Sequence, residues 1–204
     1  SKMIQIRNVP SEIHRTLKTR AARAGATLSD YLLSELADLA SRPTPEEMRE
    51  RLEGRLPDSE EKLGGRRSRG EGGPLIVVDA SAAIELLLRR EAYARVADLL
   101  LSPGQVLHAP HLLDVEVAQA LRRFEQGGHV TAARAREALD DLLALRLVRH
   151  AHTPVLTRTW ELRSNLSAYD ALYVALAESL DAPLVTMDGR LAKAPGRRAE
   201  VIVP

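Results

Sequence analysis

The chain has 204 residues, of which 45% are hydrophobic and only 3% aromatic, and it contains no cysteine. This composition is sufficient for aliphatic cores in one large domain or two small ones. Without cysteine there is no disulfide and no thiolate metal site, so any metal must be held by oxygen or histidine ligands. No apolar run approaches the roughly 18 residues of a membrane span, and the N-terminus lacks the apolar segment of a secretory signal, so we expect a soluble, cytoplasmic protein.

Charge is unevenly distributed along the chain, although the formal net charge is only +1. Residues 1–24 contain six basic side chains and one acidic side chain. Residues 44–61 contain three arginines and seven acidic side chains. A basic N-terminus is a candidate nucleic-acid face, whereas the acidic stretch must serve another purpose.

Residues 3–9 alternate between apolar and polar side chains, which predicts a β-strand. Ile4 and Ile6 would lie on one face of this strand, and Gln5 and Arg7 on the other. Pro10 ends the pattern.

Two helices are predicted to follow. Ser11 is the expected cap of the first helix, which runs to about Ala24 and is ended by Gly25. Thr27 is the expected cap of the second, with Asp30 in the position that completes a capping box. The buried side of the second helix is expected to consist of Tyr31, Leu32, Leu36 and Leu39. One strand and two short helices cannot bury a core alone, so we expect two copies to pair their strands antiparallel in an intertwined dimer.

Residues 44–56 have the pattern of an amphipathic helix. Thr44 is the predicted cap, Pro45 the first helical residue, and Glu47 is placed to reach back to the cap. The otherwise charged helix carries a narrow apolar stripe, which consists of Met48, Leu52 and Leu56. Such a helix is marginal alone in water, so we expect it to lie in a groove.

Residues 64–74 contain five glycines and no apolar side chain that could join a core, which predicts a flexible linker. After the linker, short β-rich runs alternate with longer helical runs. Strands are predicted at Leu75–Val78, Val106–Ala109, Leu147–Ala151, Leu184–Met187 and Val201–Val203. Helices are predicted at Ser81–Leu101, from about His111 to Phe124, from about Thr131 to Leu145, and at Leu166–Leu180. Apolar strands separated by helices predict an α/β domain with a parallel sheet covered on both faces.

Four acidic side chains lie where the ligand sites of such sheets form. Asp79 and Asp188 directly follow predicted strands, and ligand sites of open α/β sheets form at the carboxyl ends of strands. Glu116 and Asp170 lie near the beginnings of two helices. Two carboxylates about 5 Å apart repel by roughly 3 kcal/mol at an effective dielectric near 20, so a cation is needed. Hard oxygen ligands favour Mg²⁺ or Mn²⁺, which can activate water and stabilise the leaving oxygen of a phosphodiester.

The order of strand Met3–Pro10 and segment Gly25–Leu32 resembles the ribbon-helix-helix antitoxins of VapBC-type toxin–antitoxin systems. This resemblance implies a two-stranded ribbon that enters the major groove of operator DNA. It also implies a phosphate at the beginning of the second helix. The residues then expected to contact DNA are Lys2, Gln5, Arg7, Thr27 and Ser29. The alternative is a solvated edge strand with ordinary surface charge.

The four acids, in this order and local context, resemble the PIN domain, and in particular the ribonuclease toxins of VapBC-type pairs. The resemblance covers nearly all of residues 75–204. It implies a Mg²⁺- or Mn²⁺-dependent endoribonuclease that cleaves RNA. Its catalytic residues and metal ligands would be Asp79, Glu116, Asp170 and Asp188, with supporting hydroxyl groups on Ser81 and Thr186.

In VapBC-type pairs the antitoxin arm lies across the toxin, and an arginine often reaches the acidic active site. Arg49, Arg51 and Arg55 are the candidates here, because a guanidinium matches carboxylate geometry. They can equally form ordinary ion pairs along a solvated helix. Antitoxin and toxin are usually separate chains, and this sequence departs from that pattern.

We therefore predict four segments. They are a ribbon-helix-helix module (1–41), a toxin-inhibiting arm (42–63), a flexible linker (64–74) and a PIN ribonuclease domain (75–204). The arm would contact the nuclease in cis or exchanged between copies, at an effective concentration near millimolar, and hold it inhibited. The ribbon would make the protein a homodimer or a larger assembly.

Several alternatives remain open on the sequence. Asp114 lies two residues from Glu116 and can supply the second carboxylate in its place. An aspartyl-phosphate phosphohydrolase would need an aspartate where Ser81 stands, which argues against that chemistry. The remaining alternative is a DNA-binding transcriptional regulator with a catalytically silent PIN-like domain.

Overall fold

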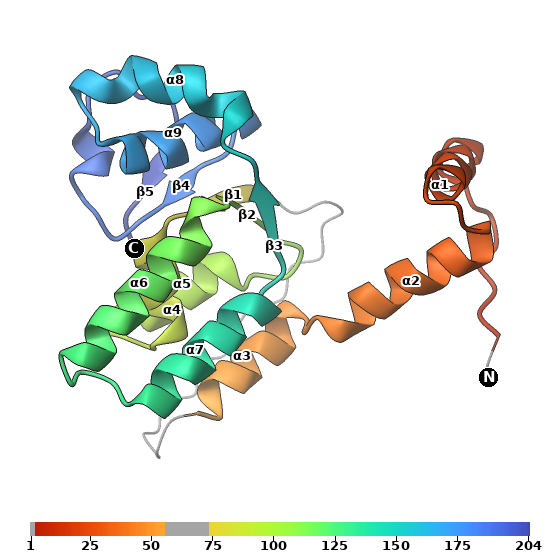
Figure 1. The fold of residues 1–204 in the computed structure, drawn as a ribbon, viewed down its shortest axis with the longest axis horizontal. Helices are drawn as coiled ribbons and strands as arrows, with labels where there is room; N and C mark the ends of the chain where they lie inside the picture. The colour runs from red at the N-terminus through yellow and green to blue at the C-terminus, as the bar shows by residue number, and fades with distance from the viewer. Residues whose placement is uncertain (1–2, 56–73) are drawn as a thin grey trace. The chain divides into compact units, whose positions relative to one another are not determined.

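The computed structural model describes residues 3–55 and 74–204 (Figure 1). The chain divides into two compact units, residues 1–42 and residues 43–204. Lys2, Leu56 and nearly all of the predicted linker lie outside the described residues. No helix in the described part is both long and apolar enough to cross a membrane.

The first unit contains helices α1 (Ser11–Arg23) and α2 (Leu28–Ser41). Pro10 rather than Ser11 is the N-cap of α1, and it provides no side-chain hydrogen bond, so the predicted Ser11 cap is wrong. Gly25 follows α1 with a φ of 66°, a conformation that glycine adopts without strain. At α2, Thr27 Oγ1 accepts a hydrogen bond from the Asp30 amide at 3.1 Å and donates one to Asp30 Oδ2 at 2.6 Å. The Asp30 carboxylate therefore bonds the Thr27 hydroxyl, not the Thr27 amide that a capping box requires.

Residues 3–9 form no strand in the single chain, and the strand that is expected to pair with a second copy stays a prediction. A strand needs a partner for its backbone groups, and no described segment pairs with these residues. Helix α2 has no buried residue, so its predicted buried side is not formed in one copy either. Large apolar side chains are consequently exposed across the first unit, namely Met3, Ile4, Ile6, Val9, Ile13, Leu33, Leu36 and Leu39. So much exposed apolar surface on so small a unit marks an interaction surface.

The second unit contains a parallel five-stranded sheet in the order β3-β2-β1-β4-β5. Its strands are β1 (Leu75–Val78), β2 (Val106–Pro110), β3 (Leu147–His150), β4 (Leu184–Val185) and β5 (Val201–Ile202). The predicted α/β fold with a parallel sheet is therefore confirmed. Strand β4 is shorter than predicted because the Met187 and Asp188 amides bond the hydroxyls of Ser81 and Thr186 instead of a neighbouring strand.

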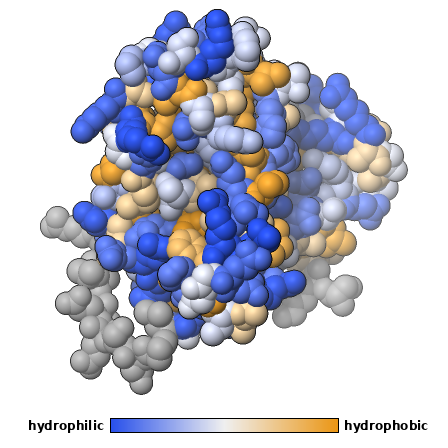
Figure 2. Space-filling model, turned by 60° about the vertical axis from the view of Figure 1, so that its left-hand side comes forward, coloured by the Kyte–Doolittle hydropathy of each residue, from blue (hydrophilic) through white to orange (hydrophobic). Residues whose placement is uncertain are grey.

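Helices cover both faces of the sheet (Figure 1). One face carries α8 (Leu156–Glu161) and α9 (Ala168–Leu180), and the other carries α4 (Ala80–Leu87), α5 (Tyr93–Leu100), α6 (Leu112–Gln126) and α7 (Ala132–Ala144). Short 3-10 turns lie at Thr153–Val155, Leu162–Ser164 and Leu191–Lys193. The helix α8 was not predicted. Most of the surface visible in Figure 2 is hydrophilic, and the hydrophobic residues that show there form small groups.

The single helix predicted at Ser81–Leu101 is in fact two helices, α4 and α5. The chain turns at Arg89, whose φ is 51°. Glu85 Oε1 accepts a hydrogen bond from the Ala92 amide at 2.6 Å and so ties the turn to α4. No glycine or proline marks this break, and the sequence pattern therefore missed it.

Helix α3 (Pro45–Glu53) belongs to the second unit and lies beside α7 (Figure 1). Its predicted capping box is confirmed, with 3.1 Å from the Glu47 amide to Thr44 Oγ1 and 2.6 Å from the Thr44 amide to Glu47 Oε2. Met48 and Leu52 are 2% and 0% exposed and join the same hydrophobic core as the sheet. The predicted amphipathic helix therefore does lie in a groove.

Candidate active site

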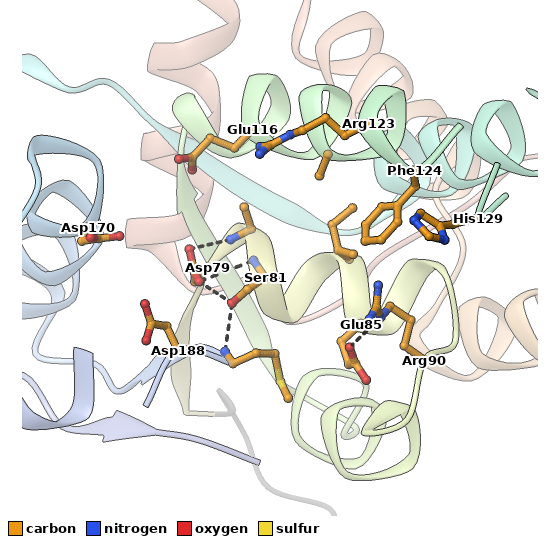
Figure 3. A pocket seen from close by; sticks show the side chains of 14 residues that line it. Asp79, Ser81, Glu85, Arg90, Glu116, Arg123, Phe124, His129, Asp170 and Asp188 are labelled. Atoms are coloured by element: carbon orange, nitrogen blue, oxygen red, sulfur yellow. Dashed lines mark hydrogen bonds and ion pairs between the residues drawn. The ribbon is translucent and has the colours of Figure 1, made fainter. Parts of the chain in front are cut away.

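The four predicted carboxylates line one pocket of about 670 Å³ at the carboxyl end of the sheet (Figure 3). Strands β2 and β3 lie on one side of β1, and β4 and β5 lie on the other. The strand order thus reverses between β1 and β4, which is where open parallel sheets bind ligands. Asp79 follows β1, and Asp188 lies on the loop after β4. Helices α6 and α9 bring Glu116 and Asp170 to the same pocket.

Asp79 is held at the beginning of α4 by several hydrogen bonds. Its Oδ1 accepts one from the Ala80 amide at 2.8 Å. Its Oδ2 accepts hydrogen bonds from Ser81 Oγ at 2.5 Å and Thr186 Oγ1 at 2.7 Å. Ser81 Oγ also accepts a hydrogen bond from the Met187 amide at 2.9 Å. The hydroxyl groups of Ser81 and Thr186 therefore join the ends of β1 and β4. This network fixes the orientation of the Asp79 carboxylate.

Glu116 receives a hydrogen bond of 2.6 Å from the hydroxyl of Tyr173, which is 1% exposed. Burial raises the pKa of Glu116, the Tyr173 hydrogen bond lowers it, and the nearby Asp79 and Asp170 raise it. Burial and the bond to Glu116 also raise the pKa of Tyr173, so this hydroxyl keeps its proton. Tyr173 is not among the site residues predicted from the sequence. Its position one helical turn after Asp170 places it on the same face of α9, and this spacing is the signal that was available.

The other two acids have local partners. Asp170 Oδ2 accepts a hydrogen bond from Ser167 Oγ at 2.8 Å, at the N-cap of α9. Asp188 forms a bidentate ion pair with Arg190, with 2.7 Å between Arg190 Nη2 and Asp188 Oδ2. The hydrogen bonds from Arg190 hold the pKa of Asp188 below its usual value. The Arg190 side chain is 91% exposed and is free to move away when another cation takes its place.

Asp114 does not line the pocket. Its carboxylate forms a bidentate pair with Arg149, at 2.7 Å to Nε and 2.9 Å to Nη2, and so ties α6 to β3. This geometry favours Glu116 over Asp114 as the second carboxylate of the site. His108 Nδ1 and His150 Nε2 lie 2.8 Å apart, and His152 Nε2 accepts a hydrogen bond from the Leu112 amide at 3.1 Å.

The acidic side chains that line the pocket are suitable ligands for a hard divalent cation. Four carboxylates around one cavity supply the oxygen ligands that Mg²⁺ and Mn²⁺ prefer. Within residues 3–55 and 74–204, however, no three acidic or histidine side chains are already close enough together to form a metal cage. Asp188 pairs with Arg190, and Glu116 bonds Tyr173. Binding a cation therefore requires small rotations of these side chains.

The family model described as PIN domain matches residues 76–197 of the chain. The chain belongs to the PIN domain family. Ribonuclease VapC1 of Mycobacterium tuberculosis (strain ATCC 25618 / H37Rv) is 48% identical over 126 residues, which cover 61% of this chain and 94% of that protein. Ribonuclease VapC12 of the same strain is 41% identical over 127 residues, which cover 62% of this chain and 97% of that protein. The crystal structure of PAE2754 from Pyrobaculum aerophilum aligns at 27% identity with a TM-score of 0.48, over 63% of this chain and 83% of that one.

PIN domains are metal-dependent nucleases, and the C-terminal part of this chain is therefore an enzyme of that class with VapC-type relatives. All four carboxylates predicted from the sequence line the pocket of the PIN domain. Ser81 lines the pocket as well, while Thr186 is fully buried behind it.

The arginines of the predicted arm do not lie in the PIN-domain pocket. Arg51 Nε and Arg55 Nη2 lie 2.7 Å and 3.1 Å from Oδ1 of Asp141 on α7. Arg49 Nη2 lies 3.2 Å from Asp98 Oδ1 and donates to the Ala97 carbonyl at 2.9 Å. The hypothesis that one of them reaches the active site is wrong for this structure, because nearer carboxylates on α5 and α7 hold all three.

The predicted DNA-contacting residues all lie in the first unit. Gln5 and Arg7 are exposed on the irregular N-terminal segment, and Thr27 and Ser29 are exposed at the beginning of α2.

Replacing Tyr173 with phenylalanine is expected to reduce metal-dependent cleavage about tenfold and to raise the Mg²⁺ concentration that gives half-maximal rate. The substitution removes the hydrogen bond that orients Glu116 while keeping the buried ring. The matched control is Tyr169→Phe on the same helix, because that side chain is 61% exposed. Equal Mg²⁺ requirements for the wild type and Tyr173→Phe would show that Tyr173 only fills the core.

Proposed function

We propose that this chain is a toxin–antitoxin protein whose PIN domain cleaves RNA endonucleolytically with Mg²⁺ or Mn²⁺. The observation that carries the proposal is the convergence of Asp79, Glu116, Asp170 and Asp188 on one pocket at the switch point of the sheet. A bound divalent cation there supplies activation of water and stabilisation of the leaving oxygen. The chain's own carboxylates hold that cation, and the Ser81 and Thr186 hydroxyls fix Asp79.

The test is cleavage of single-stranded RNA by the full chain. Activity that requires added Mg²⁺ or Mn²⁺, disappears in EDTA and is lost in Asp79→Ala supports the nuclease. An Asp79→Ala chain that cleaves as fast as the wild type would show that the cleavage does not depend on this pocket, and the proposal then fails.

The first unit is proposed to be the antitoxin, which dimerises through its N-terminal segment and binds operator DNA in the cytoplasm. The support is its exposed apolar surface, which includes Met3, Ile4 and Ile6 at 93%, 74% and 67% exposure. Pairing of residues 3–9 between two copies would satisfy their backbone groups and cover these side chains. Gln5 and Arg7 would then face the same groove of the DNA.

Arg7→Ala is expected to weaken binding to the DNA that precedes the coding sequence by at least about tenfold, because a specific arginine–base contact contributes roughly 1–3 kcal/mol. The measurement is an electrophoretic mobility shift at fixed salt, with dimer formation followed by sedimentation. Arg136→Ala on α7 is the control, since that side chain is 72% exposed in the PIN domain. Unchanged affinity in Arg7→Ala, or a wild-type chain that remains monomeric, would contradict the ribbon.

Helix α3 is proposed to be the docked part of the antitoxin segment that restrains the nuclease. Its support is the burial of Met48 and Leu52 and the three arginine contacts on α5 and α7. These contacts anchor the segment away from the carboxylates, so the restraint does not depend on an arginine in the active site. Exchange of this helix between two copies would preserve the same contacts.

One observation favours the alternative of a DNA-binding regulator with a silent PIN domain. Arg190 already neutralises Asp188, and a silent domain would keep this pair permanently. Titration with Mn²⁺ separates the two functions, because a nuclease binds the ion through Asp79 and Glu116 whereas a silent domain does not.

A further inference from the structure

The pocket of the PIN domain extends beyond the carboxylates into a second half with different chemistry. In Figure 3 the four predicted site acids lie at one end, and the side chains labelled at the other end are basic and aromatic apart from Glu85, which lies beside Arg90. We name this second half the stacking subsite, and it consists of Arg90, Arg123, Phe124 and His129. A neighbouring hollow shares three of these residues and continues the groove over Leu88 and Val130. We propose that the stacking subsite binds a nucleotide of single-stranded RNA adjacent to the scissile phosphate. This inference rests on the proposed nuclease function.

Arg90 and Phe124 form the base of the subsite. The guanidinium carbon of Arg90 lies 4.9 Å from the centroid of the Phe124 ring. Arg90 Nε also lies 3.4 Å from Oε2 of Glu85, a residue that is only 8% exposed. The buried carboxylate therefore holds the guanidinium over the ring. The Arg90 side chain remains 45% exposed, so its outer face is available to a base or a phosphate.

His129 forms the side of the subsite and is positioned by a tight turn after α6. The His129 amide donates to the Phe124 carbonyl at 2.9 Å, and the two rings meet edge to face with centroids 6.0 Å apart. A Cβ on Gly127 would lie 2.9 Å from Cδ2 of the His129 ring, and Gly128 has a φ of 71°. Gly128 therefore allows the backbone to turn here, and a side chain at Gly127 would displace the His129 ring. The exposed His129 ring offers a face on which a base can stack.

Arg123 supplies a positive charge between the two halves of the pocket. In the described part of the chain its guanidinium forms no hydrogen bond or ion pair, and the residue is exposed. A cluster of four carboxylates repels the RNA backbone, so a nearby cation is required to hold a phosphate there. A guanidinium also matches the geometry of phosphate oxygens. Arg123 is thus available for a ligand, and no described contact within the fold uses it.

The combination of ring faces and guanidinium groups fits an unpaired nucleotide. A base can stack only after it leaves a helix, and single-stranded segments present such bases. Stacking tolerates all four bases because each has a π-face. The subsite therefore contributes affinity and sets which phosphate reaches the carboxylates, without choosing a sequence by itself.

The first test is equilibrium binding by the full chain of a fluorescein-labelled single-stranded RNA of about ten nucleotides, in EDTA so that no cleavage occurs. His129→Ala is expected to weaken binding roughly five- to tenfold, with an unchanged salt dependence, because it removes stacking. Arg123→Gln is expected to weaken binding and to reduce the slope of log affinity against log salt by about 0.7, because it removes one phosphate contact. Phe124→Leu, which keeps an apolar side chain under Arg90, tests the base of the subsite.

The matched control is Arg122→Gln, because Arg122 is the neighbouring residue on α6, is exposed and does not line the pocket. Its binding is expected to stay within about twofold of the wild type. Equal losses of RNA affinity in Arg122→Gln and Arg123→Gln would mean that both arginines act only by general electrostatic attraction, which would overturn the subsite. Duplex RNA that binds as tightly as the single strand would overturn stacking.

Cleavage kinetics distinguish a failure of the subsite from a failure of the nuclease. With Mg²⁺, His129→Ala is expected to raise KM about as much as it weakens binding and to leave kcat unchanged, because it acts away from the reacting bond. Asp79-dependent cleavage with an unchanged KM in His129→Ala would overturn the subsite and leave the proposed function intact. The double variant Arg51→Ala with Arg55→Ala weakens the contacts of the proposed restraining helix and serves as the released form of the chain. Absence of RNA binding and of RNA cleavage in both the wild type and this variant would overturn both proposals.

Discussion

Glu116→Gln is expected to reduce RNA cleavage on the order of 10³-fold, whereas Asp114→Asn is expected to leave it near the wild-type rate. The two acids lie two residues apart on α6, but only Glu116 lines the pocket. Glutamine keeps the size of Glu116 and its contact with Tyr173 but removes the negative charge that a divalent cation needs. Asp114 instead pairs with Arg149, so its loss is expected to lower thermal stability without changing the chemistry.

The measurement is the initial rate of cleavage of a labelled single-stranded RNA at saturating Mg²⁺, with unfolding temperatures recorded for both variants. Asp79→Ala gives the level of a disabled site. A large loss in Asp114→Asn at an unchanged unfolding temperature would mean that the second carboxylate of the site is Asp114, and that the pocket as described is not the active site.

The double substitution Arg51→Ala with Arg55→Ala is expected to destabilise the second unit by roughly 3 kcal/mol. Both guanidinium groups contact Asp141, whose side chain is 0% exposed, and their removal leaves a buried carboxylate with reduced compensation. Burial already raises the pKa of Asp141, while Arg55 and Arg51 act against this rise. The arginines are themselves 22% and 36% exposed, so we expect the lower end of the range for a broken buried pair. In a unit of this size the unfolding temperature should fall by roughly 6–12 °C.

The control for this loss is Arg136→Ala, which breaks an exposed pair with Asp140 and is expected to cost no more than about 0.5 kcal/mol. Adding Asp141→Asn to the double variant removes the uncompensated charge and is expected to restore part of the stability. Full stability of the double variant without Asp141→Asn would show that α3 is not held by these pairs.

The same double variant tests the restraint of the nuclease. If α3 anchors an inhibitory segment, weakening its contacts is expected to raise RNA cleavage by the folded protein above the wild-type rate. A fall in cleavage that follows the loss of stability would instead assign α3 to the fold of the nuclease.

Local sequence patterns were enough to predict much of the α/β domain. The apolar runs at Leu75–Val78 and Val106–Ala109 predicted strands, because a strand buried on both faces has no polar alternation. The caps at Thr27 and Thr44 were also correct, since capping depends on side chains within three residues of the helix end. The split between α4 and α5 could not be predicted, because it depends on the buried Glu85 carboxylate reaching an amide seven residues away.

The sequence by itself predicted Asp79, Asp170 and Asp188 as site residues, because local order sets their positions after a strand or at the start of a helix, but it left Glu116 and Asp114 as alternatives for the second carboxylate. The tertiary structure brought Glu116 rather than Asp114 to the pocket. Only the tertiary structure decided which groups hold them. Tyr173 bonds Glu116 although the two are 57 residues apart in the sequence, and Thr186 bonds Asp79 over a separation of 107 residues. No local pattern encodes contacts between residues so far apart in the sequence. The arm shows the same division. Its apolar stripe predicted a groove, but the position of Asp141 on α7 determined that its arginines bind there and not at the active site.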